Sequence, residues 1–543
     1  MTHPTMASLP VTQRADGGMV SAPHGLAARA GARVLADGGT AIEAALATAA
    51  ALTVVYPHMT GLGGDMFWLI AEPGRVPLTI DGAGRAGAAV APELYTRLGL
   101  RAVPWRGPWA ANTVAGAVSA WDAAWAINAR WGGQLPLSRV FEEAIGAAEH
   151  GILVTESHAD AAAQYRTELE DVPGFKVLHF AAGAPPRAGD ILRQPALART
   201  LALLADQGLD SFYRGAVGRR IAAELAAAGV PLTATDLAGH RASVGRPLRL
   251  ALPLADVYNC RPPSQGLASL MILGLFDCLG VDTAESFAHV HGIVESTKLA
   301  FAVRAREIGH RDAAGASLDH YLEAEELLSR ASLIDRRRAA PWGEAAGDGD
   351  TAWFGVIDGE GRAVSAIQSL YFEFGSGVGL PESGFVWQNR GCAFRLEGEG
   401  PNVLGPGRKP LHTLNPAFAR FRDGRAMVYG AMGGDGQPQT QAAVFSRYAF
   451  FGQDLQDAIS APRWVLGRTW RDTATSLRLE SRFPVGLLGE LAAAGHPVER
   501  VGSFDQVMGH AGAVVHAAGG GYLGASDPRS DGAAIGCAGC PVR

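Results

Sequence analysis

The 543-residue chain has few cysteines and few lysines, and each shortage excludes a class of protein. Five scattered cysteines cannot build a disulfide framework, and the pair Cys537 and Cys540 supplies only half of a four-thiolate zinc site. With three lysines, and 47 basic against 53 acidic residues, the chain lacks the basic excess typical of nucleic-acid-binding proteins. We therefore expect no nucleic-acid partner, and we interpret the C-x-x-C pair as incidental.

Targeting signals and long apolar runs are also missing. Residues 1–18 have neither a basic start nor the apolar core of about 7–15 residues that marks a signal peptide. The longest apolar helix candidate, residues 41–56, carries Glu43 and falls short of the ~20 residues needed to cross a bilayer. These absences predict a cytoplasmic protein with no membrane partner.

Motifs for metals and phosphates are absent as well. The acidic residues and histidines show no ligand spacing such as H-E-x-x-H, and the glycine-rich loops match neither common phosphate-binding pattern. We therefore expect no metal and no organic cofactor. The pair Gly63 and Gly64 is interpreted as a packing turn.

What is present is the composition of a globular protein, with 48% apolar and 18% charged residues. Residues 24–56 show two alanine-rich helical patterns broken at Gly38 and Gly39, with Thr40 able to cap the second helix. Residues 110–230 are mostly helical by pattern, and a long helix is predicted over residues 286–306.

The composition changes sharply at residues 332–350, where three consecutive arginines, a proline, glycines and acidic residues predict an exposed, flexible connector. From Thr351 the pattern becomes strand-like, with two strands around a turn at residues 358–361. We therefore divide the chain into a helix-rich large part, residues 1–350, which ends in this connector, and a strand-rich small part, residues 351–543.

Thr351 opens a strand directly after the connector. The simplest interpretation is a β-branched residue that starts a strand. The alternative is a nucleophile that becomes a chain terminus when the bond between Asp350 and Thr351 is cut. A threonine hydroxyl is a weak nucleophile without a base, and an N-terminal threonine can use its own α-amino group, whose pKa is about 7.7–8.0.

The order of several motifs favours the second interpretation. The chain resembles the γ-glutamyltransferase (γ-glutamyltranspeptidase) family of N-terminal nucleophile hydrolases over nearly its whole length. The similar segments follow one another in the family's order: residues 17–69, the PPSQG at 262–266, 289–310, 351–377, the PLHTLNPA at 410–417, the GAMGGDGQPQ at 430–439 and the GASDPRSDG at 524–532.

This resemblance implies an α/β (α+β) fold built as a four-layer αββα sandwich. It also implies a precursor that cuts itself before Thr351 and yields large and small subunits that stay associated. Thr351 would be the nucleophile, and Ser369 would take the place of a second threonine that hydrogen-bonds it. Gly433 and Gly434 match the family's oxyanion hole, where backbone N–H groups approach the substrate closely.

Three residues are expected to hold the substrate's carboxylate by the same resemblance. Arg85 best matches the family arginine that binds this group, and a guanidinium suits a carboxylate because it can bind with two parallel hydrogen bonds. His412 and Thr413 fall on the family's paired serines, of which only Thr413 keeps a hydroxyl. A surface position for Arg85 and a packing role for His412 are the alternatives.

The chain departs from the family where that family holds the glutamate moiety. The matching positions carry Tyr371, Arg390 and Ala393, and the aspartate that pairs the α-ammonium is missing. Arg390 would attract a carboxylate and repel an ammonium. A further departure is Trp353, where the family usually has histidine. These changes indicate a branch of the family that acts on other amides. The expected one is the oxamate amidohydrolase branch, because Arg85 and Arg390 would suit a small carboxylate-bearing amide. The family's acylases, which open larger amides, are the other.

Two alternatives remain open at this point. The chain could be a true γ-glutamyltransferase or glutathione hydrolase, as its overall similarity suggests. It could also be an uncleaved, inactive relative that acts as a binding protein, although such a protein would have no need to keep Thr351 and the connector. The sequence does not identify the amide or decide between transfer and hydrolysis, and it leaves a homo-oligomer open.

Overall fold

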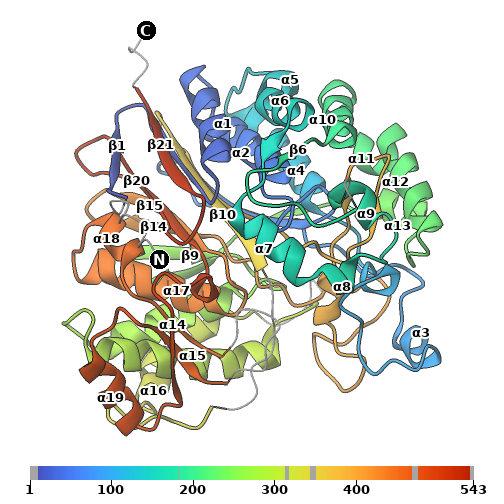
Figure 1. Ribbon diagram of the computed structural model, residues 1–543. Coiled ribbons are helices and arrows are strands. Elements are labelled where there is room, and N and C mark those ends of the chain that lie inside the picture. Colours follow the sequence, from blue (N-terminus) through green and yellow to red (C-terminus); the bar gives the residue numbers. More distant parts are fainter. Residues whose placement is uncertain (1–9, 181–182, 312–316, 343–349, 468–474, 539–543) are drawn as a thin grey trace, which may run out of the picture.

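Two antiparallel seven-stranded sheets face each other at the centre of the molecule (Figure 1). The computed structural model describes residues 10–180, 183–311, 317–342, 350–467 and 475–538, so connector residues 343–349 and Cys540 lie outside it. The first sheet has the order β1 (Gln13–Ala15), β20 (Tyr522–Ser526), β19 (Ala511–His516), β15 (Ala426–Ala431), β14 (Ala417–Phe421), β9 (Ala255–Asn259) and β8 (Leu248–Ala251). The second has the order β21 (Ala533–Cys537), β2 (Gly18–Ala22), β10 (Asp350–Asp358), β11 (Ala363–Tyr371), β3 (Asp65–Ala71), β4 (Leu78–Asp81) and β7 (Ser243–Gly245).

Helices cover the outer face of each sheet, and this confirms the predicted four layers. Helices α1 (Gly25–Ala36) and α2 (Ala41–Val55) lie on the second sheet. Helices α14 (Gly266–Cys278), α15 (Phe287–Glu307) and α17 (Gly436–Phe445) lie together on the other side, against the first sheet (Figure 1). Because both faces of each sheet are covered, strands such as β3 and β11 are buried along their whole length.

The predicted helix boundaries agree with the structure because local capping defines them. Thr40 accepts a hydrogen bond from the backbone of Glu43, whose carboxylate bonds back to the Thr40 N–H, so α2 starts with a full capping box. At the start of α15, the Ser286 side chain accepts a hydrogen bond from the N–H of His289.

Other helices surround these layers: α4 (Ala117–Arg130), α6 (Glu142–His150), α7 (Glu156–Gln164), α9 (Phe175–His179), α10 (Pro195–Gln207), α12 (Ala216–Ala227), α16 (Ala324–Ala331) and α19 (Val485–Ala493).

The strands on either side of residue 350 are interleaved. In the second sheet, β10 and β11 from the small part lie between β2 and β3 from the large part. In the first sheet, β9 from the large part pairs with β14 from the small part, and β8 pairs with β9 at the edge. The change of composition at the connector is therefore not a boundary between two separate folding units.

The described end of the connector is held in place by hydrogen bonds. The N–H of Ala339 bonds to the carbonyl of Ala494, and the N–H of Ala340 bonds to the Glu295 carboxylate at 3.1 Å. Lys298 donates to the Ala340 carbonyl at 2.6 Å. These bonds tie residues 339–340 to segments distant in sequence, and the flexibility of the connector stays a prediction.

Trp353 fills a slot between the two sheets. Its side chain is 3% exposed, and its indole N–H donates to the Ser365 hydroxyl at 3.0 Å. Gly430 on β15 and Gly512 on β19 are direct partners across the first sheet, and a Cβ on either would collide with the indole ring. The sheets can approach here because two paired glycines leave room for one tryptophan.

We predict that Gly430→Ala destabilises the protein by about 1–3 kcal/mol, because the new methyl group would overpack the buried indole. Gly146→Ala is the matched control, since Gly146 lies in α6 with open space where its Cβ would be, and alanine favours a helix. Chemical denaturation of both variants checks this. Equal stability of the two alanine variants would show that Gly430 is not needed to make room for the indole of Trp353.

Three buried histidines, His58, His158 and His179, lie around Phe374, and a fourth, His510, lies near His58. The rings of His58 and His158 stack at 5.1 Å, and the ring of His179 lies 5.0 Å from that of Phe374. Burial lowers the pKa of His158 and of His510 to about 4 and that of His179 to about 3. These side chains are therefore neutral at pH 7.

The neutral histidines predict an acid-sensitive fold. In the unfolded chain a histidine titrates near pH 6.5, so the unfolded state binds more protons between that pH and the lowered pKa of the folded state. The free energy of unfolding should have its full value above pH 6.5 and decrease as the pH drops, by about 2 kcal/mol per histidine at pH 5. Urea denaturation at pH 7 and pH 5 should show a smaller loss in His158→Phe, whereas the exposed His320→Gln should match the parent protein.

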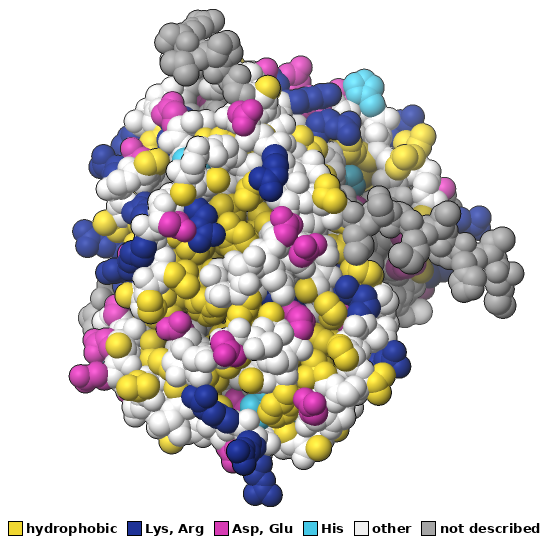
Figure 2. Space-filling model, turned by 90° about the vertical axis from the view of Figure 1, so that its left-hand side faces the viewer, with side chains coloured by type: hydrophobic (Ala, Val, Ile, Leu, Met, Phe, Trp, Pro, Cys, Tyr) yellow, Lys and Arg dark blue, Asp and Glu magenta, His cyan; other side chains and the backbone are white. Residues whose placement is uncertain are grey.

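The surface shows no single-sign stripe on the face drawn in Figure 2, where acidic and basic side chains are interspersed. Among the described residues, no helix is both long enough and apolar enough to cross a membrane.

Candidate active site

Thr351 lies near the start of β10, in the middle of the second sheet, and is completely buried. Asp350 pairs with Tyr371 and Ala352 pairs with Gln368, so Thr351 alone stands opposite two residues of β11. This is a β-bulge, a device that redirects a side chain beside many active sites. The Thr351 hydroxyl accepts a hydrogen bond from Gln437 Nε2 at 3.2 Å, which connects it to helix α17.

The Gly433–Gly434 loop joins β15 to α17, just before Gln437. Both glycines have positive φ angles, 116° and 51°, which disfavour any residue with a Cβ. Within the described chain, neither glycine N–H donates a hydrogen bond. Two free backbone donors beside a buried hydroxyl are the arrangement that an oxyanion hole requires.

A buried ion pair fixes this loop. The carboxylate of Asp435, the next residue, accepts hydrogen bonds from Nη1 and Nη2 of Arg304 on α15, at 2.5 and 3.0 Å. Gln265 accepts from Arg304 at 2.8 Å, and its own amide donates to the carbonyls of Gly434 at 3.0 Å and Thr413 at 2.8 Å. Gln265 thereby connects the glycine loop to the segment that carries His412 and Thr413.

Arg390 is the buried cation of the site, with 1% of its side chain exposed. Its Nη1 donates to the Thr413 hydroxyl at 3.3 Å, and its guanidinium lies 3.6 Å above the ring of Tyr371. Among the residues that the structure describes, its Nε and Nη2 atoms have no hydrogen-bond acceptor. Burial lowers the pKa of Arg390 to about 10, so it remains a cation at neutral pH.

The end of β11 brings Ser369 and Tyr371 to the same place. The Ser369 hydroxyl accepts from the Tyr371 N–H at 2.7 Å. Tyr371 has a φ of 86°, a strained conformation for a residue with a Cβ. The neighbouring Asn389 N–H bonds to the Leu370 carbonyl, which joins the Arg390 turn to the same strand end.

His412 is completely buried and donates from Nε2 to Asp65 at 2.8 Å. Burial and the nearby Arg390 hold the pKa of His412 well below its usual value, so its ring is neutral. Asp65 also accepts from Gln388 and from the N–H groups of Gly84 and Gly116. The predicted substrate-binding position of His412 therefore carries a packed hydrogen-bond network.

Arg85 is placed differently from the other predicted residues. Its side chain is exposed and donates to the Gly407 carbonyl at 2.9 Å, and it lines a surface cavity with Asp236 and His240. The described contacts connect Thr351, Ser369, Tyr371, Arg390, His412 and Thr413 with the glycine loop, but they do not connect Arg85 to this group. A role for Arg85 in binding a carboxylate stays a prediction.

Four further polar residues at the site were not singled out from the sequence. Gln265 lies in the PPSQG motif and Asp65 follows Gly63 and Gly64, so each had a neighbouring signal. Gln437 and Arg304 had none beyond their place in segments similar to the family. The Gly63–Gly64 pair is the predicted packing turn, since a Cβ on either residue would collide with backbone carbonyls of Val386 or Ser369.

We predict that Arg304→Met costs about 3–5 kcal/mol of stability, because it leaves the buried Asp435 carboxylate without its cation. Thermal unfolding would measure the loss. The double variant Arg304→Met/Asp435→Asn should recover part of it, since no unpaired charge remains. A double variant as unstable as the sum of the two single variants would show that the pair does not couple.

Comparison with known proteins gives a consistent result. The model of the family described as Gamma-glutamyltranspeptidase matches residues 27–537. The oxamate amidohydrolase proenzyme of Klebsiella pneumoniae subsp. pneumoniae is 51% identical over 520 residues, covering 96% of this chain and 98% of that protein. The glutathione hydrolase-like YwrD proenzyme of Bacillus subtilis is 38% identical, covering 95% of this chain and 98% of that protein.

A solved structure agrees over the whole fold. The cephalosporin acylase from Bacillus halodurans superposes with a TM-score of 0.90 at 31% identity and covers 99% of both chains. The family match spans most of the sequence and the structural match spans both sheets and their helices. The chain therefore belongs to the Gamma-glutamyltranspeptidase family and is an amidohydrolase of the N-terminal nucleophile type.

Proposed function

We propose that this enzyme is cut between Asp350 and Thr351 and then hydrolyses a small amide that carries a carboxylate, with oxamate as the model substrate. The observation that carries the substrate class is Arg390, a buried guanidinium whose Nε and Nη2 have no hydrogen-bond acceptor among the described residues. An uncompensated buried charge costs several kcal/mol, and a bound carboxylate would remove that cost. The name of the Klebsiella relative supports the same class.

Maturation would use the Thr351 hydroxyl first. Its oxygen attacks the carbonyl carbon of Asp350, and the peptide C–N bond breaks as an ester forms. Breaking that bond frees the α-amino group of Thr351, which takes up the hydroxyl proton, and water then hydrolyses the ester to the Asp350 carboxylate and the Thr351 hydroxyl. The bulge opposite Thr351 and the hydrogen bond from Gln437 support this role, because they hold the hydroxyl at an irregular position of the strand.

Turnover would repeat this chemistry on the substrate. The α-amino group of Thr351 takes the hydroxyl proton, and the oxygen attacks the amide carbonyl while Arg390 holds the adjacent carboxylate. The N–H groups of Gly433 and Gly434 donate to the oxyanion. The α-amino group returns the proton to the leaving nitrogen, ammonia departs, and water releases the acid from the acyl-enzyme. With oxamate the products are ammonia and oxalate.

Cleavage is tested on a denaturing gel. A cut chain should give bands at about 36 and about 20 kDa, in proportion to residues 1–350 and 351–543, whereas an uncut chain stays at 56.6 kDa. Thr351→Ala should remain uncut and inactive, and Thr351→Ser should keep some cutting because it keeps the hydroxyl. An active but uncut protein, or a small fragment that starts at another residue, would overturn the assignment.

The substrate class is tested by comparing kcat/KM for oxamate, glutathione and a γ-glutamyl anilide on the cleaved enzyme. Oxamate should be preferred, because a buried arginine opposes the α-ammonium of a glutamyl group. Arg390→Met should lower kcat/KM for oxamate by at least ~10²-fold while leaving self-cleavage intact, since the precursor's own peptide needs no carboxylate clamp.

Arg85→Met is the matched control for Arg390→Met. Each variant removes one arginine that the sequence analysis assigns to carboxylate binding, but replacing the exposed Arg85 should lower kcat/KM far less. A larger loss of kcat/KM in Arg85→Met than in Arg390→Met would show that Arg85, and not Arg390, binds the substrate carboxylate. Efficient turnover of glutathione with oxamate inert would show a glutamate-binding site instead.

A further inference from the structure

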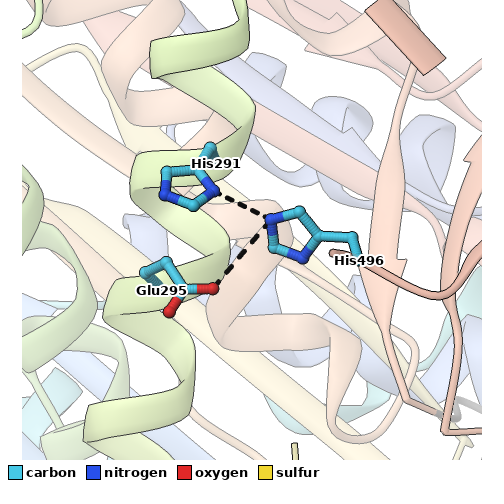
Figure 3. A group of neighbouring side chains, drawn as sticks. All are labelled: His291, Glu295 and His496. Carbon is cyan, nitrogen blue, oxygen red and sulfur yellow. Dashed lines mark hydrogen bonds and ion pairs between the residues drawn. The ribbon is translucent and has the colours of Figure 1, made fainter. Parts of the chain in front are cut away.

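We propose that His291, Glu295 and His496 form a binding site for one divalent transition-metal ion of the Zn²⁺ type. The first two residues come from α15, and His496 comes from the segment between α19 and β18 (Val498–Val501). Figure 3 shows the three side chains converging, with one ligand atom from each lying within 4.8 Å of the others. The site uses none of the residues proposed for catalysis.

The spacing suits a metal with a small adjustment. His291 and Glu295 are four residues apart and so project from the same face of α15. His291 Nδ1 lies 2.8 Å from His496 Nε2, and the latter lies 3.9 Å from Glu295 Oε1. Zinc binds imidazole nitrogen at about 2.0–2.1 Å, so two such ligands in a tetrahedron lie about 3.4 Å apart. An opening of about half an ångström between the two rings would admit the ion.

The surroundings of the rings favour metal binding. His291 Nε2 donates to the carbonyl of Asp335 at 2.8 Å, which leaves Nδ1 unprotonated and fixes the ring, as second partners of metal-binding histidines do. His496 Nε2 then donates to His291 Nδ1, and within the described chain His496 Nδ1 has no partner. When a metal takes the place of that shared hydrogen, the proton of His496 can move to Nδ1.

Lys298 is the built-in competitor for the ion. Its ammonium lies 2.6 Å from Glu295 Oε1, the carboxylate oxygen that faces His496. In the absence of a metal this ion pair balances the buried carboxylate, and a bound dication would have to share or displace the lysine. The affinity should therefore be modest in the parent protein and rise when the lysine charge is removed.

A bound ion would also secure the connector. The Glu295 carboxylate accepts from the Ala340 N–H, and His291 donates to the Asp335 carbonyl, so both ligands on α15 already bind the connector's described end. His496 adds the loop that follows α19. The ion would clamp these two segments to α15, the helix that carries Arg304, the anchor of the glycine loop.

The test is a titration of chelator-treated protein with Zn²⁺ against a chromophoric chelator, and with Co²⁺ monitored by visible absorption. We expect one ion per chain and the intense bands of tetrahedral Co²⁺. His496→Gln should weaken binding at least ~10-fold. Lys298→Met, which keeps the apolar stem, should tighten it by about tenfold. Circular dichroism shows that each variant is folded, and Glu295→Gln provides a second ligand variant if His496→Gln is not.

Surface histidines also bind zinc weakly, so the exposed His320→Gln is the matched control and should change nothing. Equal stoichiometry and affinity in the parent protein, His496→Gln and Glu295→Gln would overturn the proposal. So would a Lys298→Met variant that binds no ion. Because the readout is metal binding, failure here is independent of cleavage at Thr351 and of turnover.

Discussion

The candidate active site depends on the pairing of β10 with its two neighbours. Strand β11 pairs with β10 along most of its length, whereas β2 pairs only with Gly355–Asp358, the far half of the strand. The half that carries Thr351 therefore has a sheet partner on one side, and the extra residue of the bulge lies in β11, opposite Thr351. Trp353, two residues further on, packs against Gly430 and Gly512 and so holds the strand against the opposite sheet.

Two buried arginines have opposite electrostatic roles. Arg304 is matched by Asp435, and this pair stabilises one conformation of the glycine loop. Arg390 has a tyrosine ring and a threonine hydroxyl but no direct carboxylate partner among the described residues. A satisfied pair is suited to rigidity, whereas a cation with free donors is suited to binding an anion.

Local signals in the sequence were sufficient to predict the helices, the strands and the family, but not the contacts between distant residues. The caps of α2 and α15 and the hairpin of β10 and β11 depend on neighbouring residues, so their patterns predicted them. Asp65 with His412, and Gln265 with Gly434, meet through long-range packing that no spacing rule describes. The same reason explains His496, which lies about 200 residues from its partner His291 and so escapes a search for short metal motifs.

The interleaving of the strands has a consequence for how such a chain can be made. Because each sheet alternates strands from both sides of residue 350, neither portion has a complete sheet of its own to fold around. Cutting one peptide bond would free a new terminus without freeing a fragment. The two polypeptides would then behave as a single thermodynamic unit, and a gene divided at this point would require its two products to fold around each other from the start.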